Sequence, residues 1–263
     1  MEQTENYFKK KRVYQTLILS VIILLFILSS LLTDFSTIKA IKSLPESFIW
    51  MTKQFYPVQE SFDRLPNILD KLIETLFMSI AATTTASVFS FIMALLGSKV
   101  TAVNKVFASA SRLIASIIRN VPEVVWAMVF LFTFSQSMVT GFLALFFVTF
   151  GILTRAFIET IDETGEAAVE ALHSTGASYF QIVFQAIIPS AISQCISWIL
   201  YMIETNLRSA TLVGMLTGTG IGHLFNLYYK SLKYHEASLV VIMVIISVFI
   251  IEAISNKVRR AIL

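Results

Sequence analysis

The chain has 263 residues, of which 56% are hydrophobic and 14% are charged, and its mean hydropathy is +0.76. Soluble globular domains carry about a quarter charged residues, whereas long apolar runs recur here from end to end. The composition therefore excludes an ordinary soluble domain and predicts an integral membrane protein with several spans. A formal net charge of +3 is too small to suggest a nucleic-acid partner.

The cysteine and histidine content gives no sign of a disulfide or a metal centre. Cys195 is the single cysteine, so an internal disulfide is excluded. The histidines, at His173, His223 and His235, are too scattered along the chain to suggest a metal motif. Neither a catalytic residue nor a metal ligand is expected.

The first apolar run follows a basic cluster at residues 9–12 and is predicted to be a retained transmembrane helix. It extends over about 20 residues at 13–33, longer than the apolar core of a cleavable signal peptide. A loop at 34–66 follows, and its three prolines argue against one continuous helix. This loop is long enough to hold an interfacial helix on the outer surface.

Five further spans are expected along the chain. Residues 68–97 form the second, and small or hydroxylated residues at 81–87 predict close contact with other helices. The third, at 112–134, is interrupted by charges and a proline, which normally face a bundle interior or a cavity. The remaining spans are predicted at 139–158, 188–213 and 236–256.

Six spans would place both termini on one side of the membrane, and the basic residues indicate that this side is the cytoplasm. They cluster in the N-terminal tail, in the 99–112 loop and in the C-terminal tail. Basic residues in the 34–66 loop oppose this orientation. Residues 159–186 contain no Lys or Arg and favour neither side.

The polar stretch at 166–189, EAAVEALHSTGASYFQIVFQAIIP, is poorly suited to a membrane core. Good helix formers precede Gly176, an apolar helical segment follows at 179–188, and Pro189 marks the start of the fifth span. The pattern predicts a helix–turn–helix outside the bilayer. An amphipathic connector resting on the membrane surface fits the periodicity equally well.

The spacing within this stretch resembles the EAA loop of ABC importer permeases. Glu170 and Ala171 are followed by Gly176 and then by Pro189, in the family's order of Glu-Ala-Ala, three residues, Gly, nine residues and Ile-x-Leu-Pro. The chain departs from that pattern by apolar exchanges. In the family this loop is a coupling helix that docks in a cleft of the ATPase subunit. The resemblance assigns that role to Glu166, Glu170, Ala171, Gly176 and Pro189.

Three other segments are similar to phosphonate-importer permeases and occur in the family's order. Residues 119–127 (RNVPEVVWA) look like the start of the third core span, and 204–214 (ETNLRSATLVG) resemble the fifth. Residues 218–222 (GTGIG) resemble the glycine-rich turn that follows. The resemblance covers about residues 66–260. It implies an all-α, polytopic fold, a MetI-like importer-permease bundle of about six transmembrane helices.

The same resemblance implies a permease subunit that moves phosphonate across the plasma membrane of a bacterium. A transmembrane domain at 66–263 would follow an N-terminal region at 1–65. Since no GxxxxGK[ST] loop occurs in the chain, a separate cytoplasmic ABC ATPase would use the ATP and Mg, and this chain would bind no cofactor. An extracytoplasmic phosphonate-binding protein, a second permease copy in a homodimer and membrane lipid are the other expected partners.

Phosphite or a phosphate ester is an alternative substrate. An ion-coupled secondary transporter and a membrane-embedded enzyme are rival classes from other mechanisms. They are less favoured, because the chain shows neither a visible inverted repeat nor a metal or nucleophile–base pattern.

Polar groups in or near the spans are candidates for the translocation pathway. They are Arg119, Glu123, Glu204, Asn206 and Arg208. An arginine would lower the barrier for an anion, whereas Arg–Glu pairs would brace helices against each other. We favour bracing for the glutamates and leave both interpretations open for the arginines. Gly218, Gly220 and Gly222 predict a tight bend between the fifth and sixth spans.

Overall fold

The computed structural model describes residues 2–102 and 104–262, and their side chains except those of 2–6, 8 and 165–168. The described residues form helices and no strand, which confirms the predicted all-α class. The chain divides into two compact units, Met1–Phe55 and Tyr56–Leu263. Residues 56–65, which the sequence grouped with the N-terminal region, thus belong to the second unit.

The first unit consists of two helices whose described side chains are almost all exposed. Within α1 (Glu2–Leu32), the stretch Lys9–Leu32 is long and apolar enough to cross a membrane. The second helix, α2 (Thr37–Gln54), starts at Ser36, whose side chain accepts a backbone hydrogen bond, and contains Pro45. A helix therefore forms where the sequence predicted an interfacial one. Its place at the membrane surface stays a prediction.

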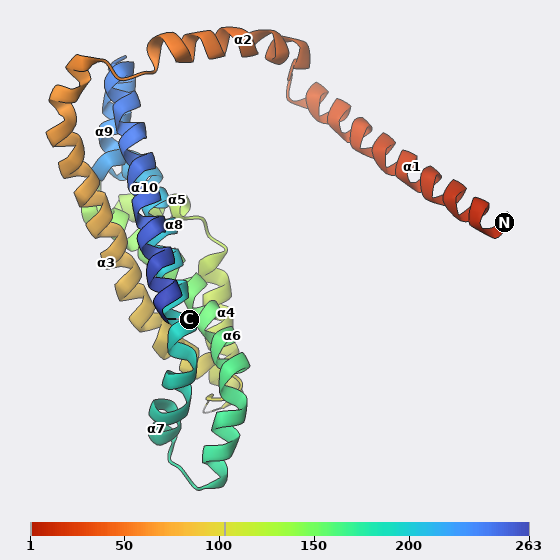
Figure 1. Ribbon diagram of the computed structural model, residues 1–263, viewed down its shortest axis with the longest axis vertical. Helices are drawn as coiled ribbons and strands as arrows, with labels where there is room; N and C mark the ends of the chain where they lie inside the picture. The colour runs from red at the N-terminus through yellow and green to blue at the C-terminus, as the bar shows by residue number, and fades with distance from the viewer. Residues whose placement is uncertain (1, 103, 263) are drawn as a thin grey trace. The chain divides into compact units, whose positions relative to one another are not determined.

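The second unit is framed by long helices (Figure 1), namely α3 (Leu65–Gly97), α6 (Met138–Ser174), α8 (Ile188–Thr217) and α10 (Tyr234–Ile262). The shorter elements are the 3-10 turn η1 (Gln59–Arg64), α4 (Lys105–Arg119), α5 (Glu123–Phe134), α7 (Tyr179–Ile182), the π-helical η2 (Val183–Ile187) and α9 (Gly220–Lys230). α3 and α6 share the most extensive contact, and α8 packs against both. The α6–α7 connection lies at one end of this unit and α9 towards the other.

Small side chains on α3 line its contact with the other long helices, as predicted for residues 81–87. Ala82 and Ala86 are fully buried. Small side chains allow helix backbones to approach closely in lipid. The Ser90 hydroxyl accordingly donates to the Phe150 carbonyl of α6 at 3.0 Å.

Five helices of the described chain are long and apolar enough to span a membrane, and a sixth span results if α4 and α5 count as one. This confirms the prediction of about six spans. The two shorter helices meet at 88°, which confirms the interruption predicted within the third span at 112–134, although the first of them begins earlier, at Lys105. Backbone at Pro122 is extended (φ −58°, ψ 149°) immediately before α5. Since the residue before a proline disfavours helical geometry, the helix breaks there.

The stretch at 166–189 forms the predicted helix–turn–helix, but it is not separated from the neighbouring spans. α6 continues without interruption from the fourth span to Ser174. After the turn, the helical residues Tyr179–Thr217 continue without a break into the fifth span. The two halves of the stretch are therefore the ends of two spanning helices (Figure 1).

Candidate functional site

The turn in the 166–189 stretch is an ordered helix C-cap built around Gly176. This glycine has φ +79°, and its N–H donates to the His173 carbonyl at 3.1 Å. The Ala177 N–H donates to the Leu172 carbonyl at 3.2 Å. Together these bonds make a Schellman motif, in which glycine is favoured because it adopts positive φ without steric cost. The glycine predicted to break the helix thus shapes a defined turn.

A π-helical segment joins the second half of the stretch to α8. At the end of η2 the Ile188 N–H donates to the Val183 carbonyl, five residues earlier. Pro189 explains the wider turn, because it has no N–H for the Gln185 carbonyl and its ring would collide with that carbonyl in a regular α-helix. Pro189 therefore lies within a continuous helical path at the start of α8.

The stretch presents one face to the core and another to its surroundings. Ile182 and Ile187 are buried in the core cluster, and a groove of about 390 Å³ separates the stretch from residues 100–102. The exposed side chains include Glu170, Ala171, His173, Phe180 and Phe184. Glu166 lies in α6, but its side chain is outside the described ones. Exposed phenyl rings are suited to contact with a protein partner.

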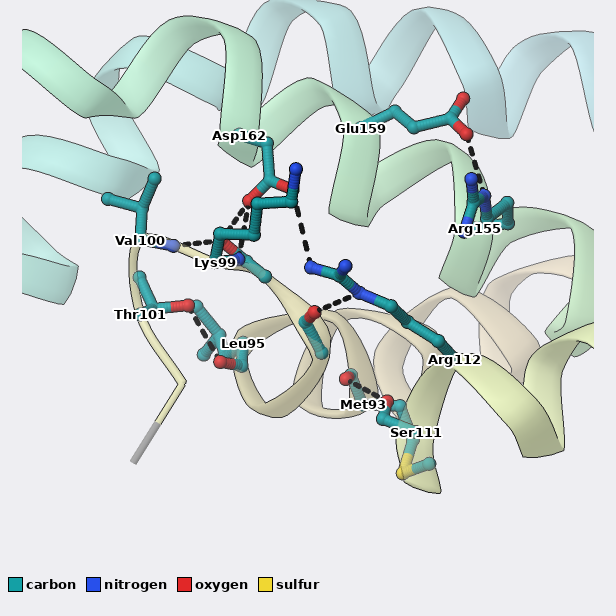
Figure 2. A network of polar contacts seen from close by, with 12 residues as sticks. Met93, Leu95, Lys99, Val100, Thr101, Ser111, Arg112, Arg155, Glu159 and Asp162 are labelled. Carbon is teal, nitrogen blue, oxygen red and sulfur yellow. Dashed lines mark hydrogen bonds and ion pairs between the residues drawn. The ribbon is translucent and has the colours of Figure 1, made fainter. Parts of the chain in front are cut away.

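Asp162, near the C-terminal end of α6, joins three helices in a network that the sequence did not reveal (Figure 2). Its Oδ1 accepts hydrogen bonds from Ser98 Oγ at 2.6 Å and from the Lys99 N–H at 2.7 Å. Its Oδ2 lies 3.5 Å from Arg112 Nη2 of α4. Arg112 Nε in turn donates to the Gly97 carbonyl at 2.7 Å. One carboxylate therefore ties α6 to the end of α3 and to α4.

Asn206, a predicted pathway residue, is a buried link between helices. Its side chain is almost completely enclosed, and Nδ2 donates to Thr83 Oγ1 of α3 at 2.8 Å and to Thr149 Oγ1 of α6 at 2.7 Å. Both amide hydrogens are thus used inside the protein. This is the geometry of a brace between α3, α6 and α8, and it leaves no donor for a transported anion in this conformation.

The predicted glutamates also make contacts within the protein. Ser209 Oγ of α8 donates to Glu123 Oε1 of α5 at 2.9 Å, and Glu204 Oε1 lies 3.3 Å from Arg208 Nη1. The Arg208 side chain is nevertheless 52% exposed, against 13% for Glu204. Glu123 thus links α5 to α8, whereas Glu204 pairs with Arg208 within α8 and the Arg208 side chain is exposed. Among the described residues, no group of three or more His, Cys, Asp or Glu side chains is placed to hold a metal.

The glycine-rich turn is a tight bend, as predicted, but it leads into α9, a helix that the sequence did not predict. Gly218 ends α8 with φ +69°, and Gly220 starts α9 with φ +59°. The Gly220 N–H donates to Glu74 Oε1 at 3.0 Å, and the Ile221 N–H donates to Thr75 Oγ1 at 2.8 Å. Side chains of α3 therefore satisfy donors that the start of α9 would leave free.

Two other glycines allow backbones to touch. A Cβ on Gly222 of α9 would overlap the Thr211 carbonyl oxygen of α8 and lie 2.9 Å from Met215 N. A Cβ on Gly151 of α6 would lie 2.6 Å from the backbone nitrogen of Arg119, whose side chain is exposed at the end of α4. The backbone of α9 therefore packs directly against α8 next to the glycine turn, and the backbone of α6 packs directly against the end of α4 next to the α4–α5 break.

Curated proteins similar to this chain carry names from phosphorus transport. The phosphite transport system permease protein PtxC of Stutzerimonas stutzeri is 30% identical over 72% of this chain and 69% of its own length. The phosphate-import permease protein PhnE of Mycolicibacterium smegmatis is 27% identical over 73% of this chain and 36% of its own. The putative cryptic phosphonate transport system permease protein PhnE2 of Escherichia coli is 29% identical over 45% of this chain and 97% of its own.

Solved structures share the fold at low sequence identity. An amino acid ABC transporter crystallised with histidines superposes with a TM-score of 0.65 at 16% identity, over 76% of this chain and 95% of that one. The MetNI methionine ABC transporter, in an inward-facing conformation, gives 0.60 at 16% identity, over 75% and 98%. Both likenesses support the MetI-like fold predicted from the sequence.

A protein-family match covers most of the second unit. Residues 86–262 match the family described as the binding-protein-dependent transport system inner membrane component. The matched region includes Asp162, the 166–189 stretch and the glycine turn, and it covers more than half of the chain. The chain therefore belongs to the binding-protein-dependent transport system inner membrane component family and is a multi-pass permease subunit of the ABC importer type.

Proposed function

We propose that this chain is the permease subunit of an ABC importer that carries phosphonates across the bacterial plasma membrane. Phosphite or a phosphate ester is the alternative substrate, because relatives named for phosphite, phosphate and phosphonate transport support the wider class of phosphorus oxyanions. Both termini and the 166–189 stretch face the cytoplasm. The chain itself performs no chemistry, and a partner ATPase uses the ATP and Mg.

The observation that carries the proposal is the continuity of the 166–189 stretch with two spans. A defined turn at Gly176 joins two helix ends, and each end runs into a membrane-spanning helix. A partner that displaces this turn therefore moves α6 and α8 directly. In a homodimer, two ATPases closing on ATP would change the central pathway from inward-facing to outward-facing. An extracytoplasmic binding protein would deliver the substrate to the open side.

Glu170 is expected to contact the ATPase, so Glu170→Lys should abolish co-purification of the ATPase with tagged permease. Reversing a charge at an interface turns an attraction into a repulsion, which costs several kcal/mol. The measurement is the amount of ATPase retained per permease after detergent purification.

The matched control for this experiment is Glu60→Lys. Glu60 is also exposed, but it lies in η1, immediately before α3. The start of α3 is at the opposite end of the second unit from the α6–α7 connection (Figure 1). We expect this variant to keep the complex intact. Full ATPase retention and ATP-driven uptake by Glu170→Lys would count against the docking role.

Arg208 is expected to attract the anion, so Arg208→Gln should lower the initial uptake rate of phosphite or methylphosphonate about tenfold. A tenfold effect corresponds to about 1.4 kcal/mol, a modest electrostatic contribution. The change also leaves the mostly buried Glu204 without its partner. The double variant Glu204→Gln/Arg208→Gln removes this leftover charge. Unchanged uptake and substrate range in both variants would remove Arg208 from the pathway.

A further inference from the structure

We propose that Asp162 is the positioning residue that transmits movement of the 166–189 stretch to α3 and α4. The proposal rests on the proposed function of that stretch as the ATPase docking segment. Asp162 belongs to the helix that ends in the docking turn, and its carboxylate holds groups from two other helices. Through these contacts, a movement of α6 would also move α3 and α4.

The first contact of Asp162 is with Ser98 and Lys99, the residues that follow α3. Ser98 is fully buried and is the C-cap of α3, with its N–H bonded to the Ala94 carbonyl. Its hydroxyl and the Lys99 N–H both donate to Asp162 Oδ1, and the Val100 N–H donates to Ser98 Oγ at 3.1 Å. The chain that leaves α3 is thus folded around a single carboxylate of α6. A shift of α6 pulls on several hydrogen bonds at once.

The second contact of Asp162 is the ion pair with Arg112 of α4. Its guanidinium bridges the Gly97 carbonyl of α3 and the Asp162 carboxylate of α6. A cation is also favourable at the C-terminal end of α3, where the helix dipole is negative. The Arg112 and Asp162 side chains are only 28% and 23% exposed, so water screens this pair less than a surface pair. Removing one charge therefore leaves its partner partly buried without compensation.

The three helices also touch closely at this level. A Cβ on Gly97 would lie 2.5 Å from Ile158 Cδ1 of α6 and 2.9 Å from Ser111 Oγ of α4. Ser111 Oγ additionally donates to the Met93 carbonyl of α3 at 2.6 Å. With a rise of 1.5 Å per residue, Asp162 lies about 12 Å along α6 from Glu170. Docking at the turn thus acts on the network through about two helical turns.

A neighbouring ion pair shows what such a link requires. Arg155 Nε lies 2.6 Å from Glu159 Oε1, and Figure 2 shows this pair beside the Asp162 network. Both residues are on α6, four positions apart, and their side chains are 41% and 56% exposed. A pair within one helix cannot carry force to another helix. Glu159→Gln is therefore a matched control, one turn away on the same helix.

The decisive variant is Asp162→Asn, studied in the complete transporter in liposomes with its ATPase and binding protein. Asparagine keeps the shape and an oxygen acceptor for Ser98 and Lys99, but it removes the charge that faces Arg112. The measured quantities are ATPase retention, ATP hydrolysis and the number of methylphosphonate molecules transported per ATP. We expect normal retention and hydrolysis, with at least a tenfold loss of methylphosphonate moved per ATP. Glu159→Gln should leave this ratio unchanged.

Other outcomes overturn the proposal. An unchanged transport ratio in Asp162→Asn would mean that the network transmits nothing. A loss of retention, hydrolysis and transport in equal proportion would assign Asp162 a structural role alone. Failure of the proposed function is recognised separately, in the unmodified complex, as uptake that needs no ATP or as a permease that retains no ATPase.

Discussion

Replacement of Gly222 by alanine is expected to prevent stable folding of the permease. The added Cβ would overlap the Thr211 carbonyl oxygen and lie 2.9 Å from Met215 N, and both are backbone atoms of α8. Overpacking costs about 1–3 kcal/mol when side chains can adjust, and here the whole of α9 would have to move. Since proteins are stable by only about 5–15 kcal/mol, we expect little monodisperse protein and a lower melting temperature in detergent.

Gly141→Ala is the control for this substitution. Gly141 is also a helical glycine, but its Cβ would meet the Met78 sulfur at 3.0 Å, the flexible part of an unbranched side chain. Alanine is also a better helix former than glycine by about 1 kcal/mol. We expect yield and melting temperature close to those of the unmodified protein. Equal yield and melting temperature of the two variants would show that α8 and α9 can move apart without loss of stability.

The spanning helices could be predicted from the sequence because lipid leaves a strong compositional record. A helix in a bilayer needs about 20 apolar residues, and such runs stand out in the chain. The angle between two consecutive helices has no such signature in the composition. The 88° bend between α4 and α5 was therefore not predicted, although Pro122 was recognised as an interruption. The α9 helix was missed for a different reason, since Gly220–Lys230 has only 11 residues and is too short to resemble a span.

Local backbone chemistry was predictable at the candidate site, whereas contacts between distant residues were not. Gly176 was recognised because a glycine after good helix formers is a common helix end. The role of Asp162 depends on Ser98 and Arg112, which are far away in the sequence and meet it only in the folded protein. Asn206 was assigned to the pathway from its polarity in an apolar span. Its threonine partners lie on two other helices, and no local pattern marks them.

Gly176→Pro is expected to separate the ATPase from a permease that still folds. Proline fixes φ near −65°, whereas Gly176 has φ +79°, and it lacks the N–H that donates to the His173 carbonyl. The mismatch costs about 3 kcal/mol or more. It falls on an exposed turn where an added Cβ would meet nothing within 4 Å. The membrane-embedded packing should therefore survive, while the two helix ends lose their relative orientation.

Gly176→Ala provides the graded comparison. Alanine keeps the N–H and costs only about 1 kcal/mol for the left-handed backbone. We expect this variant to retain the ATPase and the proline variant to lose it, at similar melting temperatures of the permease alone. Retention by Gly176→Pro would show that docking does not depend on the turn geometry. Equal loss in both variants would instead show that the ATPase approaches Gly176 too closely for any side chain, because alanine leaves the turn itself intact.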